Sequence, residues 1–248
     1  AVPRLHDVPP SVWRAVAATG FFQALYYTAL AAAYRAGDMS VAYPVARAVP
    51  VLLTSAFVVA TSGVASFTPL YAVGCLFVVG GLLLLSTGAT GVRSRLLAPC
   101  TLLALAAAVG STGYSLIDSA ALADLRSAGR FSAAGAAVFY LAAEALSSTV
   151  WMAGFTLSRR AERRTLARSP VRSWRAAALM GLGIYVTYGI VLAAMAFARN
   201  VGYIVAFRQL SVPLGAVLAI LLFREPAPAG RIAGIAVTSA GLLLVALG

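Results

Sequence analysis

The chain has 248 residues, of which 61% are hydrophobic and only 10% are charged. Soluble domains carry roughly 45–50% apolar and about 25% charged residues, so this composition excludes a water-soluble globule, a disordered chain and a coiled coil. It predicts an all-α fold, a polytopic membrane helix bundle. The formal net charge of +12 comes from arginine alone, since the sequence contains no lysine. In a membrane protein such a charge serves orientation and contact with anionic lipid, so we expect no nucleic-acid partner.

Eight stretches are apolar and long enough to cross a bilayer as helices, which takes about 20 residues. In chain order they are 15–34, 41–60, 69–87, 96–117, 131–158, 176–198, 201–223 and 232–248. The second and third are cut from one uncharged run by the turn-forming Thr, Ser, Gly and Pro of residues 61–69. Membrane barrel strands are shorter and alternate polar with apolar residues, so helices are expected. We predict a multi-pass protein of the cell (inner or plasma) membrane.

The second half of the chain repeats the first at a spacing of 161 positions. The matches are aromatic, charged and glycine pairs: Trp13 with Trp174, Tyr27 with Tyr188, Arg47 with Arg208, and Gly80 with Gly241. The matching helices lie five crossings apart in the predicted order. Because five is odd, the second copy enters the membrane from the opposite side. This is the inverted repeat that is typical of secondary transporters.

The two copies differ at their beginnings. The second copy, residues 95–248, has two predicted helices before Trp174, whereas the first copy, residues 1–94, has only 12 residues before Trp13. We therefore predict a 5+5 plan of ten helices. About eight of them are present in this chain, and the first two are missing.

Three segments carry a family resemblance: VAYPVARAVPVLLTSAFVV at 41–59, GSTGYSLIDSAAL at 110–122, and GYIVAFRQLSVPLGAVLAILLFREPAPAGRIAGIAVTSAGLLLVALG at 202–248. Together they resemble the drug/metabolite transporter (DMT) superfamily, in particular its EamA-type transporters. In that family a helix ends in a Leu-rich run and a Glu, here Glu225, before a turn and a Gly-punctuated last helix. The resemblance implies export or import of small organic metabolites by alternating access, with a small solute and the lipid bilayer as partners.

Two arginines lie well inside predicted helices, at equivalent places of the repeat: Arg47 and Arg208. A charge within the membrane costs at least about 2.5–3.5 kcal/mol on insertion scales and is a functional candidate by default. We predict that Arg47 and Arg208 bind the substrate together with their neighbours Tyr43 and Gln209. A guanidinium pairs with a carboxylate or phosphate, which favours an anionic or zwitterionic solute. The alternative is that each arginine snorkels to the interface.

Two carboxyl groups also belong to the apolar stretches. Glu144 lies near the middle of 131–158, where it couples transport to a proton or forms a structural ion pair with an arginine. Asp118 directly follows 96–117. It lies at the mouth of a cavity, or it simply caps the next turn, residues 119–122.

Tyrosine and amide side chains within the predicted helices are candidates for solute contacts, because they stack on a ligand or hydrogen-bond to it. Besides Tyr43 and Gln209, the substrate-binding candidates are Gln23, Tyr27, Tyr114 and Tyr188, and Tyr26, Tyr185 and Tyr203 are of the same kind. Some of these tyrosines must instead belong to the aromatic belts at the membrane interfaces.

Other motifs point away from catalysis. The sequence has no GxxxxGK[ST] phosphate-binding loop, and its single histidine, His6, lies in the leading segment. We expect no enzymatic activity, no cofactor and no metal site. Two alternatives stay open, an intramembrane lipid-modifying enzyme and a non-transporting membrane scaffold.

Two surface features concern partners. Gly230 and Gly234 form a small-residue motif that permits a homodimer, although packing within the chain uses the same residues. Segment 159–175 holds seven Arg and one Glu, and we expect it to be a solvated loop against lipid headgroups.

Overall fold

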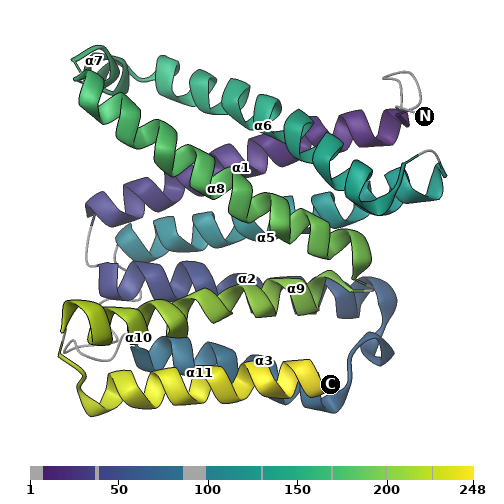
Figure 1. The fold of residues 1–248 in the computed structure, drawn as a ribbon, viewed down its shortest axis with the longest axis vertical. Helices are drawn as coiled ribbons and strands as arrows, with labels where there is room; N and C mark the ends of the chain where they lie inside the picture. The colour runs from purple at the N-terminus through teal and green to yellow at the C-terminus, as the bar shows by residue number, and fades with distance from the viewer. Residues whose placement is uncertain are drawn as a thin grey trace. The chain divides into compact units, whose positions relative to one another are not determined.

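The computed structural model describes residues 8–36, 39–85, 99–129, 131–168, 170–198, 200–224 and 226–248, and almost all of them are helical (Figure 1). The elements are α1 (Pro10–Ala36), α2 (Met39–Ser62), η2 (Val64–Ser66), α3 (Pro69–Leu85), α5 (Pro99–Ser127), α6 (Ala133–Ser158), α7 (Arg160–Arg168), α8 (Val171–Phe197), α9 (Val201–Phe207), η3 (Arg208–Leu210), α10 (Ser211–Phe223) and α11 (Ala229–Leu247). In this part of the chain, seven helical stretches are long and apolar enough to cross a membrane, and α3 is a shorter apolar helix. The protein is an all-α, multi-pass membrane helix bundle, as its composition predicted.

Several helices extend beyond the apolar stretches that predicted them. α5 continues to Ser127 instead of ending before Asp118, and α8 begins at Val171 instead of residue 176. A hydropathy window detects only the part of a helix that matches the hydrocarbon thickness. The basic segment expected as a loop contains the exposed helix α7, so that prediction was wrong about its conformation. Arg, Ala, Leu and Glu, which make up most of α7, are all strong helix formers.

The stretch predicted as one helix at 201–223 is interrupted in the structure. α9 changes to a single turn of 3-10 helix, η3, before α10 continues. Pro213 explains the change, because it has no N–H and its ring clashes with the carbonyl group four residues earlier, at Gln209. A tightened turn accommodates that loss.

The chain divides into two compact units, and α1 and α5 contribute to both. Unit 1 consists of residues 1–28 and 113–199, and unit 2 of residues 29–112 and 200–248. The units cut across the two predicted repeat copies, so the division at residue 94 stays a prediction.

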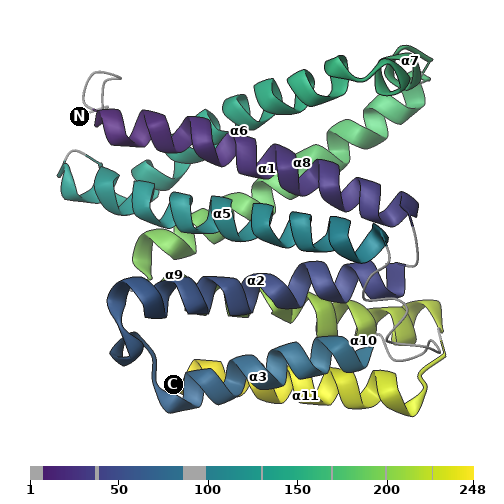
Figure 2. The ribbon, with the colours of Figure 1, turned by 180° about the vertical axis from the view of Figure 1, so that it is seen from behind.

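Unit 1 packs the first part of α1 and the last part of α5 against α6 and α8. α1 and α6 run in the same direction, since the ring of Trp13 lies 6.0 Å from Phe139 and that of Phe21 lies 5.3 Å from Trp151. α8 returns in the opposite direction after α7, which joins it to α6 at one end (Figures 1 and 2). Four helical segments therefore surround the interior of this unit.

Unit 2 is dominated by close packing of α3 against α11, which lie side by side (Figure 2). A Cβ atom added at Gly74 would lie 2.8 Å from the carbonyl oxygen of Gly241, and one at Gly81 would lie 2.9 Å from that of Gly234. These pairs run in opposite order along the two helices, so α3 and α11 are antiparallel. An inverted repeat requires this direction of its third helices.

Candidate substrate-binding site

Asp118 is the centre of a buried hydrogen-bond network in unit 1. Its side chain is fully buried, and its Oδ1 accepts from the Thr19 hydroxyl at 2.5 Å and the Tyr140 hydroxyl at 2.9 Å. Its Oδ2 accepts from the hydroxyl of Tyr188. The three donors come from α1, α6 and α8, so one carboxyl group ties four helices together. The expectation that Asp118 caps a turn was wrong, because α5 continues through it.

Glu144 is a second buried carboxyl group, with a hydrogen bond of its own. It lies one helical turn after Tyr140 on α6 and is fully buried. The side-chain amide of Gln23, one turn after Thr19 on α1, donates to its Oε1. Both carboxyl groups are thus held by uncharged hydroxyl or amide donors from neighbouring helices.

The members of the network recur at helical spacing, which places them on one face of each helix. Residues on α1 and α6 are four apart, and those on α8 are three apart. One helical turn further along α6, the hydroxyl groups of Ser148 and Tyr185 form a separate contact of 2.9 Å on the same face. We call the following set the polar stripe: Thr19, Gln23, Tyr27, Asp118, Tyr140, Glu144, Ser148, Tyr185 and Tyr188.

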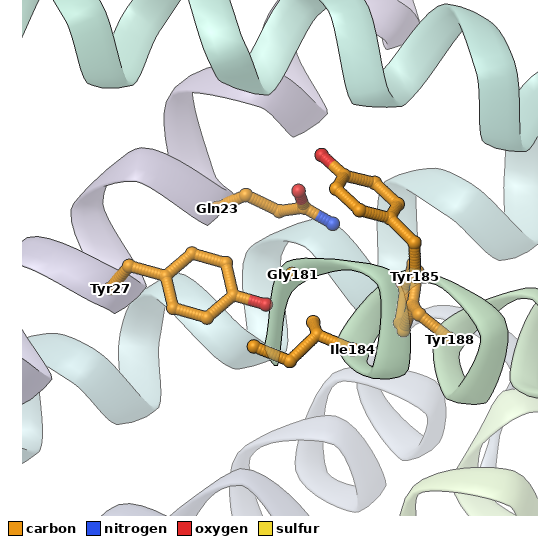
Figure 3. A pocket seen from close by; sticks show the side chains of 6 residues that line it. All are labelled: Gln23, Tyr27, Gly181, Ile184, Tyr185 and Tyr188. Atoms are coloured by element: carbon orange, nitrogen blue, oxygen red, sulfur yellow. The ribbon is translucent and has the colours of Figure 1, made fainter. Parts of the chain in front are cut away.

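A cavity of about 160 Å³ lies beside the polar stripe, within unit 1. It is lined by Gln23 and Tyr27 of α1 and by Gly181, Ile184, Tyr185 and Tyr188 of α8. Figure 3 shows Gln23 and Tyr27 reaching from α1 toward these α8 side chains. An engineered cavity of about 150 Å³ holds a benzene molecule, so this volume suits one small organic group.

Glycine at position 181 leaves part of this volume open. A Cβ atom added at Gly181 would meet nothing within 4 Å. The cavity therefore combines an amide, three tyrosine rings and one aliphatic side chain around an unfilled space. Such a mixture of mostly aromatic surface with a few polar groups is typical of small-molecule sites.

A second, larger space adjoins the cavity at Tyr27 and Tyr185, which line both. It measures about 370 Å³. We call it the vestibule, and its remaining lining residues are Ser148, Thr149, Met152, Ala153, Thr156 and Leu157 of α6, Leu166 of α7 and Trp174 of α8. Its wall is mainly apolar at the end where α6, α7 and α8 meet.

The structure brings most of the predicted residues of unit 1 together. Gln23, Tyr27 and Tyr188 line the cavity, and Asp118 and Glu144 bond to two of them. Tyr114 is buried, and its ring packs edge-on at 5.6 Å from that of Tyr188 and at 5.8 Å from that of Tyr26. It therefore supports a cavity residue and does not line the cavity.

The other predicted residues belong to unit 2. The guanidinium of Arg47 lies 5.4 Å from the ring centre of Tyr43, a cation–π contact on a half-buried arginine. Arg208 is also half-buried, in η3, and its neighbour Gln209 is buried with its amide donating to the Val205 carbonyl. A role for these four side chains in substrate binding stays a prediction.

Three members of the polar stripe were not predicted: Thr19, Tyr140 and Ser148. Thr19 lies four residues before Gln23, and Tyr140 and Ser148 lie four residues either side of Glu144. Polar residues at this spacing share a helix face with the predicted ones. That spacing is the signal that would have found them.

Comparison with protein-family models, with curated proteins and with solved structures found no match. The resemblance to EamA-type transporters therefore rests on the sequence segments quoted above.

Proposed function

We propose that this multi-pass membrane protein is a secondary transporter of the cell membrane, which binds a small organic metabolite in the cavity of unit 1. The observation that carries the proposal is the polar stripe, with two fully buried carboxyl groups, beside an open cavity. Ionisable groups within membrane segments are expensive and as a rule functional. A scaffold would be served as well or better by apolar packing at these positions.

Gln23 gives the proposal its mechanism. Its side chain lines the cavity and also donates to Glu144, so a solute that engages Gln23 alters the surroundings of that carboxyl group. In the transport cycle Glu144 takes up a proton from water on one side of the membrane and releases it on the other. The proton gradient then drives solute transport, because proton binding at Glu144 and solute binding at Gln23 affect each other. The tyrosines supply ring faces and hydroxyl groups for the solute.

Transport is favoured over catalysis by the position of the acidic groups. A catalytic carboxyl group must reach the reacting atoms, within about 3 Å or through one water. Asp118 and Glu144 are instead enclosed by hydroxyl and amide donors, and neither lines the cavity. Their contact with the solute is indirect, which suits coupling.

The test is proton movement in liposomes that contain the full chain and a pH-sensitive dye. Amino acids, amines, nucleosides, sugars and carboxylates are added singly, and one class should move protons when its own gradient is imposed. In Glu144→Gln, exchange of that labelled solute should persist while proton movement is lost. Glutamine has the shape of glutamate and still offers an oxygen that accepts the hydrogen bond from Gln23, but it cannot take up and release a proton.

Glu162→Gln on α7 is the matched control and should keep both activities. No solute-dependent flux from any class would count against transport. Proton movement that survives in Glu144→Gln would reject the coupling role while leaving solute binding in place.

A further inference from the structure

α7 lies where two membrane-spanning helices end. It begins two residues after the end of α6 and is followed closely by α8, so it lies at the boundary between hydrocarbon and water. None of its residues is buried. With the residues around it, segment 159–175 carries seven Arg and one Glu.

The arginines of α7 share one side of the helix. Arg160, Arg164 and Arg168 are four residues apart, and Arg163, three residues after Arg160, lies at the edge of this row. Leu166 lies on another side of α7 and lines the vestibule. The short helix therefore presents a cationic face and an apolar side chain to different surroundings.

The vestibule beneath Leu166 is large and mostly apolar at this end. Met152, Ala153 and Leu157 of α6 and Trp174 of α8 line it together with Leu166. Trp174 is half exposed, as expected of a tryptophan at a membrane interface. The vestibule is thus bounded by a helix whose other side carries a row of arginines, an arrangement complementary to a molecule with an anionic head and an apolar tail.

We propose that α7 and the vestibule form a binding site for an anionic phospholipid. The phosphate group binds the arginine face of α7, and the first part of an acyl chain enters the vestibule against Trp174. Guanidinium groups pair with phosphate oxygens by two parallel hydrogen bonds, which a zwitterionic headgroup with its own cation satisfies less well. This binding does not depend on the proposed transport activity.

The test uses the fluorescence of Trp174. The other two tryptophans are replaced in the full chain, as Trp13→Phe and Trp151→Phe, and the protein is titrated in neutral detergent with phosphatidylglycerol or phosphatidylcholine brominated on the acyl chains. Bromine quenches tryptophan only at close range, so quenching reports lipid in the vestibule. We expect phosphatidylglycerol to quench at a concentration at least about tenfold lower than phosphatidylcholine, since several arginines near an anionic lipid each add to its attraction.

Two triple variants with the same change in net charge distinguish binding at α7 from a general attraction of anionic lipid to a basic protein. R160Q/R164Q/R168Q should lose the tenfold preference, whereas R14Q/R35Q/R224Q, which removes three exposed arginines elsewhere, should keep it. Ala153→Phe, which fills the vestibule, should reduce quenching by both lipids. Each of these results supports the site.

Other results would overturn it. Equal quenching by the two lipids, or an unchanged preference in R160Q/R164Q/R168Q, would show that the arginine face does not select the headgroup. Reversal of the quenching by inorganic phosphate, at ionic strength matched with chloride, would show that the face binds a free anion and not a lipid.

Discussion

The interiors of the two units differ in how they use small and polar residues. In unit 2, Gly74 and Gly81 let α3 approach the backbone of α11 within about van der Waals distance, and the contact is continuous. In unit 1, Gly181 borders an unfilled cavity, and the neighbouring core is a network of hydroxyl, amide and carboxyl groups. Close glycine packing is how membrane helices associate tightly without a hydrophobic driving force. The packing of unit 2 therefore suits a rigid pair of helices, α3 and α11, whereas the interior of unit 1 suits a binding site.

The largest effect is expected where the glycine packing of unit 2 is broken. In Gly241→Val the new Cβ would lie 2.6 Å from the backbone nitrogen of Val78 and 2.7 Å from the carbonyl oxygen of Gly74. Neither backbone atom can move alone, so we expect a loss of about 3 kcal/mol or more, measured as the unfolding temperature and the folded yield in detergent.

The matched control for this change is Gly80→Val. Gly80 lies on α3, is the repeat equivalent of Gly241, and has nothing within 4 Å of an added Cβ. It should unfold close to the temperature of the parent chain. If both variants are equally stable, close packing of α3 against α11 is not what holds unit 2.

A smaller loss of stability is expected when the polar core of unit 1 is altered. Asp118→Asn keeps the shape but replaces one acceptor oxygen by an NH₂ group, which then faces a hydroxyl donor. The cost of a disrupted buried hydrogen bond is about 1–3 kcal/mol, or roughly 2–4 °C per kcal/mol for a chain of this size.

Asp124→Asn, an exposed change on the same helix, should stay within about 0.5 kcal/mol. Asp118→Asn should also lower transport. Unchanged stability and transport in this variant would mean that the hydrogen bonds to Asp118 contribute nothing to the fold or the site.

The smallest effect is expected from the arginines of unit 2. Arg47→Gln and Arg208→Gln should each weaken solute uptake by about tenfold, because one hydrogen bond to a charged group contributes, at its lower limit, about 1.5 kcal/mol, while membrane insertion stays intact. Solute uptake is measured with the reconstituted variants, and membrane insertion is measured as the amount of protein in the membrane. If both variants transport normally, the two arginines are interface residues and take no part in uptake.

Hydropathy predicted the helices well because the bilayer allows few alternatives: a spanning segment must be long, apolar and internally hydrogen-bonded. The same reasoning gave wrong ends for α5 and α8 and missed α7, since helices continue outside hydrocarbon without an apolar signal. The turn of 3-10 helix at η3 gives no hydropathy signal, but Pro213 in the sequence indicates a local distortion of this helix.

The site was predicted in part for a similar reason. A polar side chain in an apolar stretch stands out, which identified Gln23, Asp118 and Glu144. Their grouping depends on how four helices turn toward each other, and that rotation is set by packing across the chain. Their partners are Thr19 and Tyr140. Threonine and tyrosine are too common in membrane helices to stand out when the rotation of the helices is unknown.

The repeat illustrates the same limit. It pairs Gly80 with Gly241, yet only Gly241 lies against a neighbouring backbone. Sequence spacing aligned the two helices by position, but the face that each one buries is decided by its partner. Residue equivalence in a repeat therefore does not guarantee equivalent contacts.

The central claim, that the cavity of unit 1 is the solute site, is tested most directly by filling it. Gly181→Leu places a side chain in the cavity without meeting other atoms at its Cβ, and Gly183→Leu adds the same side chain at an exposed position of α8 that is equally open. Both variants should fold and insert as the parent chain does. Uptake of the solute identified in liposomes should fall by at least about a hundredfold in Gly181→Leu and stay near the parent value in Gly183→Leu. Equal uptake by the two variants would contradict the claim.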